Sequence, residues 1–139
     1  MSRRKAREYA LKVLFQVDQV NSDPQAAFNY LLREGPLNEK DQEFCWALIE
    51  SCLHNLPQLD QQILQFSRDC SLERIPSIDR NIMRVALSEM LLLKKTTPVV
   101  AIDEAIEIAK KYSDEGSAKF INAILDKVLV KIDEAIPGD

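Results

Sequence analysis

The stretch IDRNIMRVALSEMLLL, residues 78–93, decides the fold class. When it is placed at 3.6 residues per turn, its apolar side chains nearly encircle the axis, which predicts a central helix buried on almost every side. The rest of the chain suits helical neighbours, because it has only three glycines in 139 residues and little strict alternation of apolar and polar positions. The sequence therefore predicts an all-α protein.

Apolar spacings of three and four predict six further helices, about seven in all, with starts near residues 3, 24, 38, 57, 98 and 116. Two of these starts carry a capping residue followed by proline, at residues 23–24 and 97–98. The segment SLERIP, residues 71–76, breaks the helical pattern. We therefore predict one domain, 1–139, built of two small antiparallel bundles at about 1–70 and 77–135.

Composition argues against an enzyme, a zinc protein and a membrane protein. The one histidine, His54, lies near the end of a predicted helix, where its side chain can act as a cation or hydrogen-bond donor to the C-terminal carbonyl groups. Cys45, Cys52 and Cys70 lack the spacing of a zinc site and are expected to be free thiols. The sequence contains neither a long apolar run nor a phosphate-loop or metalloprotease motif. We predict a cytoplasmic binding protein with no catalytic residues, metal or cofactor.

The first twelve residues, MSRRKAREYALK, are basic in an acidic protein. They hold five cations against Glu8 alone, whereas the whole chain has 18 Lys+Arg against 22 Asp+Glu. Cations are unfavourable at the positive end of a helix. We therefore expect them to bind an external anion, such as a phosphate backbone, which offsets this cost. The alternative is a solvated terminus with no specific role.

A second possible RNA contact lies in YSDEGSAKFINAILDK, residues 112–127. Lys119 stands close to a predicted helix start, with Tyr112 and Phe120 nearby. A cation, aromatic rings and free helical N–H groups together can bind a single-stranded nucleic acid. Phe120 also lies on the apolar stripe of its helix, so a role in the core is the alternative for that residue.

Three segments together resemble the NusB family: AREYALKVLFQ at 6–16, residues 78–93, and AIDEAIEIAKKYSDEGSAKFINAILDKV at 101–128. The resemblance implies an all-helical fold of two small bundles and a function without catalysis. With NusE, a small-subunit ribosomal protein, such factors bind the single-stranded boxA element of nascent RNA. They act in the RNA polymerase antitermination complex, which then reads through terminators, notably on ribosomal RNA operons.

The resemblance also assigns residues to surfaces. For RNA it implies contacts by the start of the first helix and the start of the last. For NusE it implies a surface around the fourth and fifth helices, with two acidic positions and one arginine. The RNA residues are Arg3, Arg4, Lys5, Arg7, Tyr112, Lys119 and Phe120, and the NusE residues are Glu73, Asp79 and Arg84. The chain departs from the family pattern at Val99 and Val100, where a basic residue is common, and also at Asp103 and Gly116.

Two other functions fit the same resemblance. NusB-like domains also form the RNA-recognition part of some ribosomal RNA methyltransferases, and the end of the sequence at Asp139 is expected to argue against that role. A protein-interaction module or homodimer that does not bind RNA is the other alternative.

Overall fold

Seven α-helices make up most of the computed structural model, which describes residues 2–67 and 71–135. The described residues contain no strand. The elements are α1 (Ser2–Val20), α2 (Pro24–Glu34), α3 (Glu39–His54), α4 (Leu56–Phe66), the short 3₁₀ turn η1 (Leu72–Arg74), α5 (Ser77–Leu87), the π-helix η2 (Ser88–Leu93), α6 (Pro98–Tyr112) and α7 (Glu115–Ala135). The all-α prediction and the predicted order of helices are confirmed.

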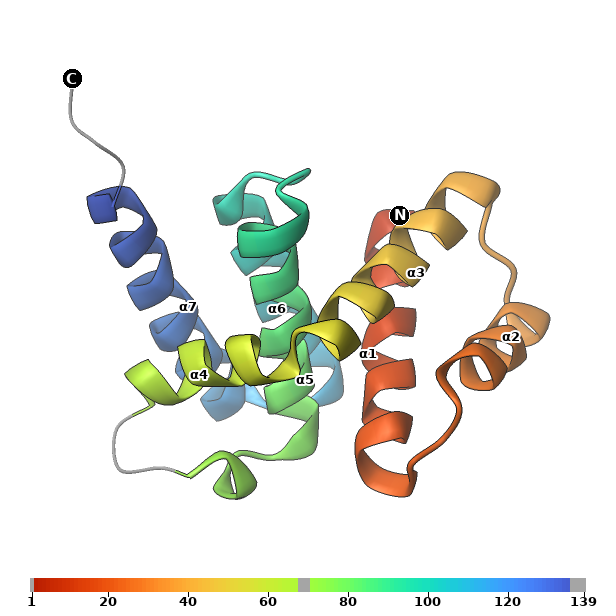
Figure 1. Ribbon diagram of the computed structural model, residues 1–139, viewed down its shortest axis with the longest axis horizontal. Coiled ribbons are helices and arrows are strands. Elements are labelled where there is room, and N and C mark those ends of the chain that lie inside the picture. Colours follow the sequence, from red (N-terminus) through yellow and green to blue (C-terminus); the bar gives the residue numbers. More distant parts are fainter. Residues whose placement is uncertain (1, 68–70, 136–139) are drawn as a thin grey trace.

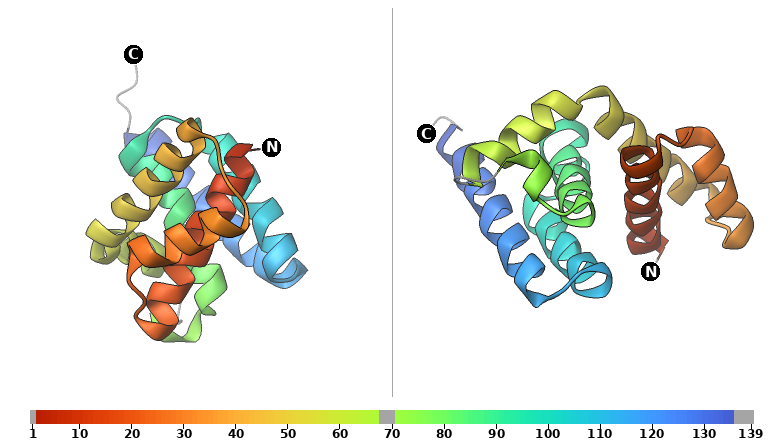
Figure 2. Two further views of the ribbon diagram at one scale, coloured as in Figure 1. Left: turned by 90° about the vertical axis from the view of Figure 1, so that its right-hand side faces the viewer. Right: turned by 90° about the horizontal axis from the view of Figure 1, so that it is seen from below.

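The helices pack together around one hydrophobic cluster. Helices α1 and α2 lie at one end, α6 and α7 lie at the other, and α3 and α4 cross between the ends (Figure 1). Figure 2 shows the same arrangement from two further sides, with α6 and α7 as neighbours and α5 inside the group. That cluster includes buried residues from all seven α-helices. The division of the chain into two sub-bundles remains a prediction.

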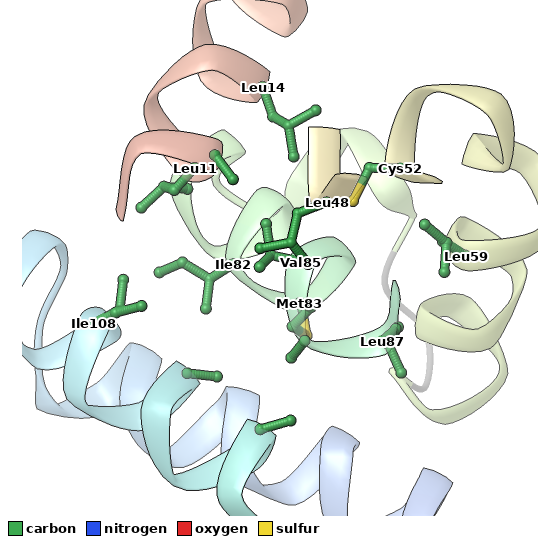
Figure 3. Packing of buried hydrophobic residues seen from close by; sticks show 14 of the residues in the cluster. Leu11, Leu14, Leu48, Cys52, Leu59, Ile82, Met83, Val85, Leu87 and Ile108 are labelled. Atoms are coloured by element: carbon green, nitrogen blue, oxygen red, sulfur yellow. The ribbon is translucent and has the colours of Figure 1, made fainter. Parts of the chain in front are cut away.

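Helix α5 is the central element, as its apolar pattern predicts. Every residue from Asn81 to Leu87 is buried, and α1, α3, α4, α6 and α7 all pack against it. Figure 3 shows Ile82, Met83 and Val85 among side chains from the surrounding helices. From Ser88 onward the backbone widens into the π-helix η2, which the sequence pattern did not predict. The first two residues of η2, Ser88 and Glu89, are polar and buried.

The helix starts show which sequence signals set the boundaries. Asp23 accepts a hydrogen bond from the backbone N–H of Ala26 at 2.9 Å, which confirms the predicted cap of α2. At Pro98 the predicted start of α6 is correct, but the Thr97 side chain makes no capping hydrogen bond. Helix α7 begins at Glu115, one residue before the predicted start, because Asp114 caps it with a hydrogen bond from the Ser117 N–H at 2.7 Å.

Gly35 ends α2 at a close approach of α2 to α1. The Tyr9 hydroxyl donates a hydrogen bond to the Gly35 carbonyl at 2.7 Å. A Cβ atom at Gly35 would lie 2.5 Å from that hydroxyl oxygen, so glycine permits the contact. The residues that follow, 36–38, are thereby held beside the first turns of α1.

The described cysteines lie in the core. Cys45 and Cys52 are buried free thiols on α3, and burial raises the pKa of each to about 12. Cys70 lies outside the described residues. Within the described part of the chain, no group of His, Cys, Asp and Glu is placed to hold a metal ion. No helix there is long and apolar enough to cross a membrane.

We expect Leu48→Ala to lower the free energy of unfolding by about 2–5 kcal/mol, because Leu48 is fully buried and its loss leaves a cavity. Urea unfolding followed by circular dichroism measures the change. Leu64→Ala is the matched control, since Leu64 is 41% exposed, and a change within about 0.5 kcal/mol is expected there. Equal effects of the two substitutions would contradict this description of the core.

Candidate nucleic-acid interface

The first turns of α1 present cations to solvent. No acidic residue stands in the first turn of this helix, and Arg3, Arg4 and Lys5 are exposed there. About half of the side-chain surface of Arg3 (53%) and of Arg4 (45%) remains accessible although both form ion pairs. These three predicted RNA residues are therefore available to a phosphate backbone.

Arg7 lies beneath this surface, and its predicted contact with RNA stays a prediction. Its side chain is 7% exposed and points into the protein. The guanidinium donates hydrogen bonds at 2.6 and 3.0 Å to the two carboxylate oxygens of Glu89, and a third at 3.4 Å to Glu104. A polar pair buried to this extent joins α1 to η2 and α6. Arg7 therefore holds the basic helix in place.

Arg4 is held by the same acidic side chain of α6. Its Nε and Nη2 atoms donate to the two oxygens of Glu104 at 3.1 and 2.6 Å. This bidentate hydrogen bonding from Arg4 lowers the pKa of the Glu104 carboxyl, and the charge of Arg7 adds to the effect. The guanidinium of Arg4 thus has a defined position and still faces solvent.

Glu8 organises a second set of cations beside the first. The Tyr112 hydroxyl donates to its Oε1 at 2.7 Å, and the Lys111 Nζ donates to the same oxygen at 2.9 Å. Burial by itself would raise the pKa of Glu8, but these two hydrogen bonds and the charges of Lys111 and Lys12 together outweigh it, and the pKa is lowered. Lys12 lies over the Tyr112 ring, with Nζ 5.6 Å from the centroid.

These groups line a shallow groove of about 620 Å³ between α1, the segment after α2, and the end of α6. We call it the α1 groove. It contains four cations and one carboxylate, with an aromatic ring on each of α1 and α6. Its lining residues are Arg4, Lys5, Glu8, Tyr9, Lys12, Pro36, Leu37, Asn38, Lys111 and Tyr112.

Lys111 lines this groove but is not among the residues predicted from the sequence. Its signal was present, since Lys110 and Lys111 directly precede Tyr112 in the last turn of α6. Lys119 is exposed on α7, and Phe120 is half-buried and packs against the core. Neither of these two residues lines the α1 groove. Their predicted contact with RNA stays a prediction, on a surface separate from that groove.

Two of the three predicted NusE residues are buried, and their predicted contact with NusE stays a prediction. Asp79 is 2% exposed and accepts a hydrogen bond from the Ser113 hydroxyl at 3.0 Å. Arg84 is 6% exposed and donates at 2.7 and 2.8 Å to the carboxylate of Asp60. Both side chains connect helices within the fold. Glu73, on η1, is the exposed member of the three.

A family model described as the NusB family matches residues 4–130. The chain belongs to the NusB family. The transcription antitermination protein NusB of Syntrophomonas wolfei is 59% identical over 129 residues, which cover 93% of this chain and 96% of that protein. The NusB of Pelotomaculum thermopropionicum is 39% identical over 137 residues, covering 99% and 95% of the two chains.

Solved structures of NusB proteins have the same fold. A NusB structure from T. maritima matches with a TM-score of 0.85 and 36% identity, covering 93% of this chain and 91% of that one. A structure of the antitermination factors NusB and NusE in complex with dsRNA matches with a TM-score of 0.86 and 25% identity, covering 94% and 97%. The all-α, NusB-like fold predicted from the sequence is confirmed.

We expect Glu89→Gln to lower the free energy of unfolding by about 3–5 kcal/mol, because it leaves the buried Arg7 guanidinium without its carboxylate. The double variant Arg7→Met/Glu89→Met should recover most of that loss, since it buries no charge. Arg4→Gln, which removes an exposed pair, should cost less than about 1 kcal/mol. Urea unfolding measures all three, and a double variant no more stable than Glu89→Gln would contradict the assignment.

We expect the Glu104 carboxyl to titrate below its ordinary value of 4.5. Because its lowered pKa favours the folded state, this stabilisation should be present above about pH 4.5 and lost as the pH falls through the lowered pKa. Arg4→Gln should raise the pKa toward 4.5, and Lys110→Gln, an exposed cation on the same helix, should leave it unchanged. Side-chain carboxyl NMR across pH 2–7 measures it, and an unmoved pKa in Arg4→Gln would exclude the arginine as its cause.

Proposed function

We propose that this chain is an RNA-binding transcription antitermination factor. With NusE it binds boxA-type single-stranded RNA, and as part of the RNA polymerase antitermination complex it promotes read-through on ribosomal RNA operons. Membership of the NusB family and the likeness to a NusB structure solved with NusE and dsRNA support this function. The observation that carries it to particular residues is the cationic α1 groove.

The groove suits a phosphate backbone. Arg4 and Lys111 are fixed by carboxylates of Glu104 and Glu8, yet both remain largely exposed, at 45% and 60% of their side-chain surface. A cation held in place loses little side-chain freedom when a phosphate arrives, which favours affinity. Lys5 and Lys12 make no ion pair within the described residues and add two further positive charges beside them. The Tyr112 ring offers a face for base stacking.

Lys119 and Phe120 form the second part of the proposed RNA surface. Lys119 is exposed on the second turn of α7 and Phe120 is accessible over part of its ring. On the partner side, the exposed Glu73 is the residue we assign to contact with a basic NusE surface, while Asp79 and Arg84 support the helices behind it. The protein acts in the cytoplasm and we assign it no catalytic step.

The test is fluorescence anisotropy of labelled boxA RNA and a scrambled RNA, titrated with this protein alone and with NusE over a salt series. Preferential binding to boxA that tightens with NusE is expected. For Lys5→Gln/Lys12→Gln, loss of two phosphate contacts should make the log–log salt dependence shallower by about 1.4. The matched control, Lys127→Gln/Lys131→Gln, changes two exposed lysines of α7 and should behave as the unaltered chain. Equal weak binding to both RNAs, unaffected by NusE, would contradict the proposal.

A further inference from the structure

A second basic hollow lies on the α3 side of the first turn of α1. It has a volume of about 270 Å³ and draws its side chains from α1, α3, the end of η2 and the segment after η2. We call it the α3 groove. It shares no residue with the α1 groove, and it is lined by Arg3, Lys40, Glu43, Phe44, Ala47, Leu93 and Lys95. Figure 1 shows the N-terminal end of α1 beside α3, where these elements meet.

Arg3 has a fixed position at this hollow. Its guanidinium carbon lies 4.1 Å from the centroid of the Phe44 ring, which is a close cation–π contact. Its Nε lies 3.6 Å from a carboxylate oxygen of Asp41, too far for a hydrogen bond but close enough for charge attraction. Asp41 is buried in the first turn of α3, so the positive end of that helix offsets part of its charge.

The two lysines of the α3 groove are available to bind an anion. Lys40 and Lys95 are exposed, and neither forms an ion pair within the described residues. Lys94 has a left-handed backbone conformation, φ 54°, and its N–H donates to the Glu89 carbonyl at 2.9 Å. This tight turn at the end of η2 directs the chain back and brings Lys95 to the hollow beside α3. Two unpaired lysines and one stacked arginine thus face Glu43.

We infer that the α3 groove binds the phosphate backbone of RNA that flanks the segment held in the α1 groove. The inference rests on the proposed function. RNA fits better than an acidic peptide because the two hollows meet at adjacent residues, Arg3 and Arg4, on opposite sides of one helix end. A single strand that crosses the start of α1 therefore meets cations on both sides. The strand contributes phosphates at regular spacing, and lysines bind phosphate as point charges without a required base.

The experiment compares Lys40→Gln/Lys95→Gln with the matched control Lys127→Gln/Lys131→Gln. Each variant is titrated against labelled boxA RNA and against the same RNA lengthened by unrelated single-stranded nucleotides at its 5′ or its 3′ end. For one of the two lengthened RNAs, the one whose added nucleotides reach the α3 groove, the α3 groove variant should lose roughly tenfold in affinity near 0.1 M salt. Its log–log salt dependence should be shallower by about 1.4. For the short RNA it should stay within about twofold of the unaltered chain, because the α1 groove is intact.

The outcomes separate this inference from the proposed function. If the unaltered chain binds boxA RNA but the α3 groove variant and the control respond alike to every RNA, the inference is wrong and the proposed function stands. If the variant loses affinity for NusE while its RNA binding is unchanged, the hollow is a protein site and the inference is also wrong. If the unaltered chain binds none of the RNAs, both proposals fall. Thermal unfolding of each variant is the control for folding, and an unchanged midpoint is expected because the substituted lysines are exposed.

Discussion

The buried ion pair between Arg7 and Glu89 is the constraint on which the rest of this molecule depends. It joins α1, which carries the basic surface, to η2, the continuation of the central helix, with hydrogen bonds of 2.6 and 3.0 Å. Taking two charges out of water is costly, and the pair is tolerable because both carboxylate oxygens and three guanidinium nitrogens have partners. The geometry requires Glu89 to face α1, and the π-helical turn begins at the residue before it.

Outward from that pair, acidic residues hold basic ones in place. Glu104 binds both Arg7 and Arg4, and Glu8 binds Lys111 and Tyr112. Each carboxylate reduces the net charge of the surface, yet each also orients a cation that stays accessible. A protein with a net charge of −4 can in this way present a local cationic site without attracting nucleic acid over its whole surface.

The start of α1 lies between two hollows, the α1 groove and the α3 groove, and supplies basic side chains to both. Arg3 stacks on Phe44 on one side, while Arg4 and Lys5 face the other. The basic residues that are unfavourable for the helix dipole therefore lie where three elements bring further lysines: Lys40 from α3, Lys95 from the turn after η2, and Lys111 from α6. None of these lysines is near the first turn in sequence.

The fold could be predicted from the sequence to a large extent, because apolar periodicity and helix caps are local. The pattern of residues 78–93 predicted a central buried helix, and the signals at Asp23 and Pro98 set the starts of α2 and α6. The π-helix could not be predicted, because the apolar pattern of residues 88–93 suits an α-helix equally well. Helix α7 begins one residue before its predicted start, because the capping residue is Asp114.

The sequence by itself determined that the chain is helical, which faces are apolar, and that cations gather at its start. Only the tertiary structure decided which charges are free. Arg7, Asp79 and Arg84 are of the same residue types as charged residues on the surface, so the sequence does not distinguish them. Each is buried against a partner distant in the sequence, which is Glu89, Ser113 and Asp60 respectively. Helical periodicity places a side chain on a face, whereas the role of a charge depends on what lies opposite it, and that is set by the packing of helices far apart in the chain.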